Sequence, residues 1–190
     1  YLGGQAGAGA LADVLTGRVN PGGKLAETFP LRLEDQPAQP YPGGPGTVEY
    51  RESLYVGYRY YDTAGVEVLF PFGHGLSYTT FAYRDLVLQR SGETVTAVFK
   101  VKNTGAVAGK ETAQVYVRDV GSTPFRPQKE LKGFARVALQ PGEEQEVTIA
   151  LGPRAFAFYD AAAANWAVEP GEFEILVGAS SRDIRLKASL

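Results

Sequence analysis

The sequence predicts a mainly β chain, in which an antiparallel β-sandwich over residues 75–190 follows a helix, a short strand and an extended linker. Across residues 75–190, short runs of alternating apolar and polar residues are separated by turn signals. Residues 31–74 are instead rich in Pro, Gly and Tyr. Residues 1–30 begin with apolar residues at helical spacing and end in one short extended segment. These changes of pattern divide the chain after residues 30 and 74.

Residues 1–30 are expected to form the end of a domain and not a domain of their own. One helical face carries Ala6, Ala10, Leu11, Val14 and Leu15. Gly17 stands at the expected C-cap, and residues 24–29 form a short extended segment that Pro30 ends. A lone helix and one short strand cannot bury an apolar face. Because the chain also contains no Met and begins at Tyr1, we expect it to be a piece of a longer protein.

Residues 31–74 are predicted to form an extended connector. Prolines and glycines crowd residues 37–46 and disfavour both helix and strand. The next stretch, residues 50–61, is dense in tyrosine. A tyrosine favours a half-buried position in which its hydroxyl reaches a partner. We therefore expect the connector to lie against protein.

The remaining segment has the size and pattern of an immunoglobulin-like β-sandwich. The expected strands cover residues 81–89, 94–102, 112–118, 130–139, 146–151, 156–159, 166–168, 172–177 and 184–186. Since the chain has no Cys, the disulfide of an antibody domain is excluded. We expect the single tryptophan, Trp166, to be a core or corner residue.

Composition excludes several classes of function. The net charge of -2 argues against nucleic-acid binding, which needs a basic surface. No apolar run is long enough for a transmembrane helix, so we expect no membrane contact. The absence of Cys and the single His leave no thiolate chemistry and no histidine-rich metal site, and we expect no cofactor. The compartment of a soluble chain of this kind stays open between cytoplasmic and secreted.

Two short motifs suggest chemistry but have simpler explanations. Residues 7–12 loosely match a dinucleotide-binding fingerprint, and Glu27 lies at a suitable distance, but no strand–helix–strand unit surrounds them. A closely packed helix of small residues explains the motif more simply. His74 is a conceivable general base. Its flanking glycines and the absence of a nucleophile signature favour a structural histidine in a tight turn.

Most charged residues are expected to be solvated surface groups, and only a few are candidates for function. A retaining glycosidase needs two carboxyl groups about 5–5.5 Å apart. Most carboxylates here alternate with apolar residues on expected strands or cluster in turns, as solvated groups do. Glu49 and Glu52 lie among tyrosines, a combination found in sugar-binding sites, although a tyrosine-packed connector explains them equally well. The basic run at residues 126–134 is expected to be a loop and a strand edge.

Several motifs together resemble the C-terminal part of family 3 glycoside hydrolases, the β-glucosidase and β-xylosidase family. The matching segments, in chain order, are ADVLTG (12–17), NPGGKL (20–25), TFP (28–30), YRE (50–52), VGYRYYD (56–62), FPFGHGLSYT (70–79), NTG (103–105), KELKGF (129–134) and VEPG (168–171). By this resemblance, residues 1–30 are the C-terminal end of an α/β-sandwich domain and residues 31–74 are a linker. Residues 75–190 are then a fibronectin type III-like β-sandwich.

The resemblance implies a retaining, exo-acting β-glycosidase of the β-glucosidase type, which removes terminal β-linked sugars through a glycosyl-enzyme intermediate. In that family the nucleophile is an aspartate on an N-terminal barrel, and the acid/base is usually a glutamate farther upstream in the α/β-sandwich domain. Neither motif occurs in this sequence. We therefore expect no catalytic residue in this chain and no activity from it alone. Gln5, in a turn at the edge where α/β domains bind ligands, is the candidate to approach the sugar in the intact enzyme.

The expected role of residues 75–190 is to stabilise catalytic domains that precede them, on the same polypeptide or on a separate chain. A small glycoside is the expected substrate of the whole enzyme. The alternative is a carbohydrate-binding module that anchors the enzyme to polysaccharide, which needs an exposed, coplanar row of aromatic rings. The candidates for such a row are Phe125, Phe156, Phe158, Tyr159 and Trp166.

Overall fold

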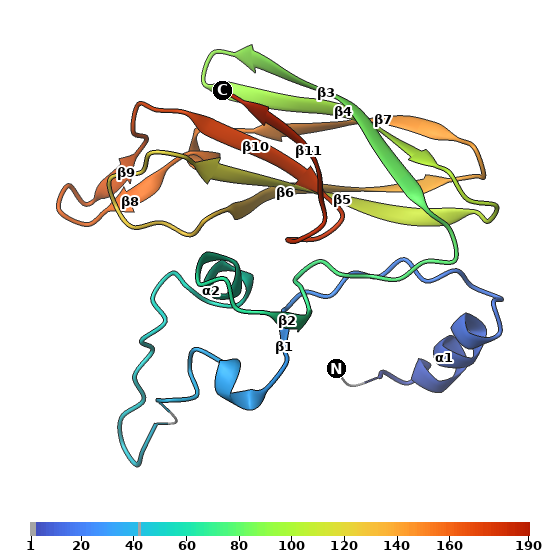
Figure 1. Ribbon diagram of the computed structural model, residues 1–190, viewed down its shortest axis with the longest axis horizontal. Coiled ribbons are helices and arrows are strands. Elements are labelled where there is room, and N and C mark those ends of the chain that lie inside the picture. Colours follow the sequence, from blue (N-terminus) through green and yellow to red (C-terminus); the bar gives the residue numbers. More distant parts are fainter. Residues whose placement is uncertain (1–2, 42) are drawn as a thin grey trace.

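Two antiparallel sheets form the body of the protein, and a long N-terminal arm runs beneath one of them (Figure 1). The computed structural model describes residues 3–41 and 43–190. The three-stranded sheet has the order β3–β4–β7, and the four-stranded sheet has the order β11–β10–β5–β6. The strands are β3 (Phe81–Ser91), β4 (Thr94–Asn103), β5 (Gly109–Asp119), β6 (Glu130–Leu139), β7 (Glu144–Leu151), β10 (Phe173–Gly178) and β11 (Ile184–Ser189). The predicted mainly β fold is confirmed.

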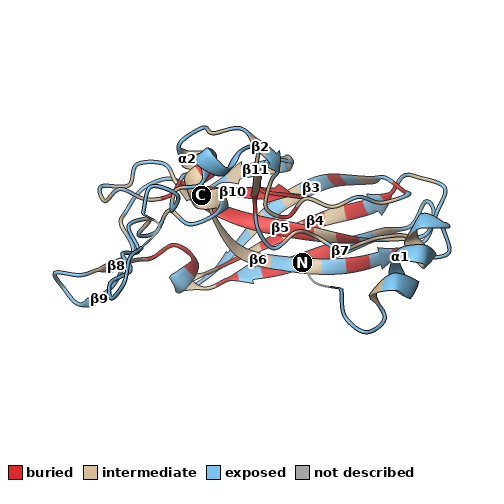
Figure 2. Ribbon diagram, turned by 90° about the horizontal axis from the view of Figure 1, so that it is seen from below, coloured by how far each residue is buried: buried red, intermediate tan, exposed pale blue. Residues whose placement is uncertain are grey.

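The core lies between the two sheets, because alternate residues of each strand point inward. On β4 the inward residues are Val95, Ala97, Phe99 and Val101. They face Val115 and Val117 on β5, Val137 and Leu139 on β6, and Phe173, Ile175 and Val177 on β10. Figure 2 shows the buried residues of the strands as a layer inside the sandwich. Removal of this apolar surface from water is the main force that holds the sandwich together.

A protruding hairpin interrupts the sandwich between β7 and β10. It follows the 3₁₀ turn η2 (Pro153–Ala155) and consists of β8 (Phe158–Asp160) and β9 (Asn165–Ala167). Trp166 lies on this hairpin and is 43% exposed. The expectation that Trp166 is a core or corner residue is therefore wrong. The reason is that β8 and β9 form a separate two-stranded ribbon, so a side chain on it has no facing sheet.

The predicted strand pattern is confirmed along the whole sandwich. Each of the nine expected strands is present, and each begins and ends within three residues of its predicted bounds. The largest differences are at β5, which begins at Gly109, and at β11, which continues to Ser189. Short polar runs at the ends of these strands carry no alternation, so the sequence pattern underestimates their length.

The arm contains α1 (Gly7–Leu15), β1 (Phe29–Pro30), η1 (Leu33–Asp35), α2 (Tyr58–Thr63) and β2 (Val68–Phe70). Helix α1 is present as predicted, and Gly17 has the left-handed φ of 73° that the expected C-cap requires. The expected strand over residues 24–29 shrinks to β1, which pairs with β2. None of the helices in the described residues is long and apolar enough to cross a membrane.

Helix α2 was not predicted. Its six residues make fewer than two turns, and the tyrosines at positions 58, 60 and 61 do not repeat with a helical period over a useful length. The helix exists because it is bound to the sandwich. Tyr61 is buried, and Tyr58 packs on the four-stranded sheet. Tertiary packing therefore fixes a helix that would be too short to form by itself.

Candidate functional site

The arm is attached to the outer face of the four-stranded sheet. This contact, which we call the seam, joins residues 20–25 and 58–80 to β5, to β6 and to the turn between β10 and β11. Alternation along β5 directs Gln114 and Tyr116 away from the core, yet these side chains are 3% and 0% exposed. Rings of the arm cover them. Tyr58 stacks on Phe72 with centroids 4.8 Å apart, and it meets Tyr116 edge-on at 5.9 Å.

Gln114 fixes the path of the arm where it crosses β5. Its Nε2 donates hydrogen bonds to the carbonyl oxygens of Ala179 (2.9 Å) and Gly73 (3.3 Å), and its Oε1 accepts one from the Tyr116 hydroxyl. Gly73 has a φ of 80°, and a Cβ there would lie 2.2 Å from Gln114 Oε1. Only glycine fits this crossing without displacing the amide. His74, the next residue, belongs to the same turn.

Helix α2 seals the start of β6, which is an edge strand of the sheet. The backbone N–H of Leu131 donates to the Tyr58 hydroxyl at 2.7 Å, and the N–H of Gln128 donates to Thr63 Oγ1 at 3.0 Å. Burial raises the pKa of Tyr58, so the hydroxyl stays neutral at physiological pH. The two side chains satisfy backbone donors that an open sheet edge would leave for another chain.

Asp62 is the charged centre of the seam. Its carboxylate is 4% exposed and lies between Lys129 Nζ (2.9 Å) and Arg182 Nε (2.8 Å). The same guanidinium donates to the carbonyl oxygens of Tyr61 (3.1 Å) and Val66 (2.7 Å). One carboxylate on α2 therefore binds both the loop before β6 and the turn before β11.

The basic run at residues 126–134 is neutralised internally. Arg126 donates to Asp119 (3.1 Å), to Glu130 (3.2 Å) and to the carbonyl oxygen of Phe156 (3.1 Å). Lys132 lies 3.4 Å and Arg59 lies 3.5 Å from carboxylate oxygens of Glu130. Burial raises the pKa of Glu130, but these three cations outweigh it and hold that pKa below its usual range. The run is the loop and strand edge that the sequence predicted.

A second set of bonds ties the segment after α1 to the opposite end of the sheet. Asn20 Nδ2 donates to the Ala108 carbonyl oxygen at 2.9 Å, while its Oδ1 accepts from Ser77 Oγ (3.0 Å) and the Tyr78 N–H (2.8 Å). The Tyr78 hydroxyl donates to the Val14 carbonyl oxygen at 2.7 Å. A single asparagine side chain thus joins three segments of the chain.

A buried ion pair lies between these two sets of bonds. Lys24 Nζ is 2.9 Å from Glu111 Oε1, and the Tyr83 hydroxyl donates to the same oxygen at 3.1 Å. Burial, followed by the charge of Glu111, raises the pKa of Tyr83. The phenol therefore remains a donor, and the carboxylate is fully committed to structure.

The sequence-based candidates for chemistry do not converge on one place. Gln5 is exposed in the turn before α1, and the hypothetical fingerprint at residues 7–12 lies within α1. The His74 ring stacks on Phe70 at 5.1 Å, and its backbone carbonyl accepts from the Leu25 N–H, as suits a structural residue in a turn. Glu49 is exposed and pairs with the neighbouring Arg51. Among the described residues, no cluster of three or more His, Cys, Asp or Glu could hold a metal ion.

The five aromatic candidates for a polysaccharide platform do not form a coplanar row. Phe156 is buried in the core, and Phe125 packs on Tyr55 at 4.9 Å. Tyr159 and Trp166 are cross-strand partners, but their rings meet at 65°, and Arg154 lies 3.4 Å from the centroid of the Trp166 ring. Flat stacking on a polysaccharide needs parallel rings, so this geometry does not supply the row that the alternative function requires.

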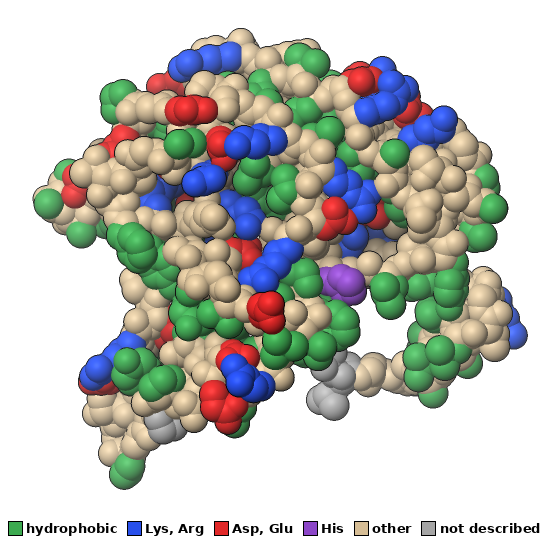
Figure 3. Space-filling model, viewed as in Figure 1, with side chains coloured by type: hydrophobic (Ala, Val, Ile, Leu, Met, Phe, Trp, Pro, Cys, Tyr) green, Lys and Arg blue, Asp and Glu red, His purple; other side chains and the backbone are tan. Residues whose placement is uncertain are grey.

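The side of the arm that does not contact the sandwich carries several exposed leucines. Leu11 and Leu15 of α1 are 60% and 73% exposed, and Leu76 is 74% exposed. A groove of about 630 Å³ lies beside them, lined by Leu25, Ala26, Phe29, Phe70, His74 and Leu76 among others. Figure 3 shows the histidine beside hydrophobic side chains on this part of the surface.

These features define a class of protein: an antiparallel β-sandwich of fibronectin type with an N-terminal arm bound to the outer face of one sheet. Residues 1–78 match the C-terminal domain of glycosyl hydrolase family 3, and residues 111–181 match a fibronectin type III-like domain. Together the two matches cover most of the chain, and they agree with the resemblance of its motifs to the C-terminal part of family 3 glycoside hydrolases.

Three similar proteins illustrate the relationship. The chain is 57% identical over its full length to thermostable β-glucosidase B of Acetivibrio thermocellus, of which it covers 26%. It is 48% identical over 97% of its length to an exo-α-(1→6)-L-arabinopyranosidase of Bifidobacterium breve, of which it covers 25%. The crystal structure of a β-glucosidase from Bifidobacterium adolescentis superposes with a TM-score of 0.94 at 46% identity, over 98% of this chain and 28% of that one. The chain thus spans about a quarter of the length of these relatives.

The seam residues were missed in the sequence, and the reason differs between them. Asp62 and Lys129 are 67 positions apart and give no local signal. Gln114 stands at a position that alternation assigns to the exposed face of β5. The tyrosine-rich stretch did predict that the connector lies against protein, and this is confirmed for Tyr58 and Tyr61, whereas Tyr50 is 87% exposed.

Replacement of Asp62 should weaken the whole fold. In Asp62→Asn, the buried Lys129 keeps its charge but loses its anion, and such unpaired buried charges cost about 3–5 kcal/mol. The exposed pair of Asp13 and Arg18 supplies the matched control, where Asp13→Asn should cost about 0–1 kcal/mol. Urea unfolding of both variants measures the difference, and equal costs would show that Asp62 has no special role.

The seam should also make the fold sensitive to acid. Because the pKa of Glu130 is lower in the folded chain, its contribution is complete above the ordinary value of 4.5 and is lost as the pH falls through the folded pKa. Glu130→Gln should therefore remove about 1–3 kcal/mol at pH 7 and flatten the loss of stability between pH 5 and pH 3. Urea unfolding across this range tests it, with exposed Glu146→Gln as the control. An unchanged acid slope in Glu130→Gln would contradict the assignment.

Proposed function

We propose that this sequence serves a retaining, exo-acting β-glycosidase of the β-glucosidase type, in which it acts as a structural module. The observation that carries the proposal is the identity of 57% over the whole chain to a β-glucosidase, with a TM-score of 0.94 to the fold of another. Such an enzyme cleaves terminal β-linked sugars through two carboxyl groups, one as nucleophile and one as acid and base.

The carboxylates of this chain support a structural role. A catalytic carboxylate must be free to attack carbon or to exchange a proton. Asp62, Glu111 and Glu130 are buried or nearly so, but each is held by cations of the seam. We infer that the two reacting carboxyl groups lie on other domains of the enzyme, which are the partners of this module.

The two sides of the arm suggest how the module acts. Its polar side is fixed to the sandwich by the seam, and its apolar side offers Leu11, Leu15 and Leu76 to a further domain. Contacts between domains of one chain bury about 600–1,500 Å². A misplacement of about 1 Å at a catalytic centre costs about a hundredfold in rate. A rigid sandwich that holds the end of the catalytic domain can therefore support the reaction without touching the sugar.

We infer the same division of the chain as the sequence suggested. Residues 1–30 end an α/β-sandwich domain, residues 31–74 link it to the sandwich, and residues 75–190 form the fibronectin type III-like domain. The family match at residues 1–78 ends near the proposed start of the sandwich, and the match at residues 111–181 lies within the sandwich. The choice of sugar is expected to depend on other domains, because relatives of similar identity carry the names β-glucosidase and arabinopyranosidase.

Removal of the sandwich from the whole enzyme should destabilise the domains that it supports. An enzyme that lacks residues 75–190 should melt at a lower temperature and lose solubility, because the polar side of the arm would have no partner. Conversely, the chain of 190 residues alone should not hydrolyse p-nitrophenyl β-glucoside. Melting curves and steady-state rates of the three proteins test this. A deletant with unchanged stability and rate, or turnover by the isolated chain, would refute the proposal.

Gln5 remains the candidate in this chain for a contact with substrate. It is exposed in the turn before α1, and no bond to the rest of the described chain fixes its amide. In the whole enzyme, Gln5→Ala should raise KM by about fivefold to tenfold if the amide forms one hydrogen bond to sugar. Exposed Gln145→Ala on β7 is the control. Kinetic constants that match those of the control would remove Gln5 from the site.

A further inference from the structure

A cavity of about 440 Å³ opens at the end of the sandwich, and its lining residues lie outside the seam. The β3–β4 hairpin forms one wall, and η2, the segment that leads into β10 and the residue after β11 form the other. Its apolar lining consists of Val95, Pro153, Phe156, Val168, Pro170, Phe173 and Leu190. The volume lies within the range of about 300–1,000 Å³ that is typical of small-molecule sites.

Two charged residues of this cavity, Arg90 and Glu93, lack ion-pair partners among the described residues. Within the described residues, Arg90 forms no ion pair, and its Nε donates a hydrogen bond to the Gly92 carbonyl oxygen at 3.3 Å. Glu93 likewise pairs with no cation there. Most other arginines of the sandwich are engaged by carboxylates, as Arg84, Arg126 and Arg185 are. An arginine guanidinium and a glutamate carboxylate that both lack ion-pair partners at one cavity are therefore unusual among the described residues of this protein.

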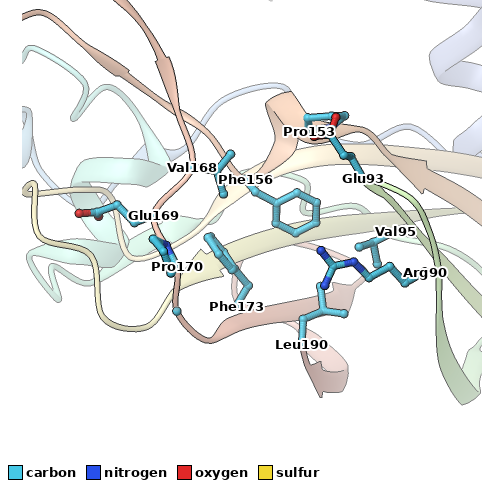
Figure 4. A pocket seen from close by; sticks show the side chains of 11 residues that line it. Arg90, Glu93, Val95, Pro153, Phe156, Val168, Glu169, Pro170, Phe173 and Leu190 are labelled. Atoms are coloured by element: carbon cyan, nitrogen blue, oxygen red, sulfur yellow. The ribbon is translucent and has the colours of Figure 1, made fainter. Parts of the chain in front are cut away.

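The arrangement of these groups limits the ligand. Figure 4 shows Arg90 extending across the cavity toward Phe173 and Leu190, while Glu93 lies on another side beside Pro153. The Glu169 side chain points away, and its Oε2 accepts from the Thr123 N–H at 3.0 Å. Because one cation and one anion face the cavity, a ligand of strong net charge gains from one and is repelled by the other.

Between the two charges, Phe156 and Phe173 form an aromatic floor. Their rings meet edge to face, with centroids 5.3 Å apart at 82°. Both residues are 7% exposed, so the floor presents ring edges and apolar atoms to the cavity. A ligand that fits has an apolar C–H face for the floor, hydroxyl donors for Glu93 and oxygen acceptors for Arg90. A pyranose meets all three requirements.

We propose that this cavity is a binding site for one neutral pyranose unit, separate from any catalytic site. Arg90 donates to ring or hydroxyl oxygens, Glu93 accepts from hydroxyl groups, and the floor of Phe156 and Phe173 packs on the C–H face. Hydrogen bonds to charged groups are about twice as strong as neutral ones, so two of them suit a neutral polyol. The site does not depend on the proposed hydrolase activity, because every group in it belongs to this chain.

The test is a titration of the ¹⁵N-labelled 190-residue chain, followed by amide chemical shifts. The probes are glucose for a free sugar, cellotetraose for the end of a polysaccharide, and benzoate for an aromatic anion. We expect saturable shifts at residues 90–95 and 168–173 with a sugar, and none with benzoate at equal concentration. Saturation by glucose assigns the site to free sugar, and saturation by cellotetraose alone assigns it to chain ends.

Substitutions of Arg90 and Glu93 test whether sugar binds in this cavity. Arg90→Ala and Glu93→Gln should each weaken sugar binding by about tenfold, as expected for the loss of one charged hydrogen bond. The matched controls are Lys102→Ala and Glu146→Gln, which remove exposed charges on β4 and β7 and should leave binding unchanged. Melting curves confirm that all four variants fold. Absence of saturable shifts with both sugars, preference for benzoate, or equal effects in the controls would overturn the proposal.

Discussion

The structure depends on one constraint: the outer face of the four-stranded sheet must be covered. Gln114 and Tyr116 on β5 and Glu174 and Leu176 on β10 point away from the core and are still buried. A buried amide that lacks partners costs about 1–3 kcal/mol, so the chain that covers Gln114 must present carbonyl oxygens at fixed positions. Gly73 supplies one of them, and the close approach it requires sets the course of the arm.

The seam and the core hold the molecule together by different means. Apolar burial between the sheets is non-directional, and a core tolerates exchanges between apolar side chains of similar volume. The seam is made of directional bonds, such as those of Asn20 to two other segments and those of Asp62 to two. Directional bonds tolerate one arrangement. We infer that the core supplies most of the stability and that the seam supplies the fixed geometry of the arm.

The sequence predicted the sandwich well because each strand carries its own signal. Alternation in β4, β6 and β7 follows from their position between one core and solvent, and Pro–Gly and Asn–Thr–Gly turns mark their ends. The same rule failed where a second layer exists. Gln114 looked exposed because the arm that covers it lies 41 residues away in sequence, and Trp166 looked buried although its ribbon has no facing sheet. No single-residue pattern contains that information, since it depends on which distant segments meet.

The distribution of surface character on the arm connects the fold to the proposed role. If the arm were only a tether, its side away from the sandwich would be polar, because exposed leucines gain nothing in water. Leu11, Leu15 and Leu76 are exposed there, while Asn20, Tyr58 and Asp62 of the arm form polar bonds to the sandwich. An element that is polar toward one body and apolar toward the other side is suited to join the two. The polar bonds define its orientation on the sandwich, and the apolar side supplies the free energy for holding a further domain in that orientation.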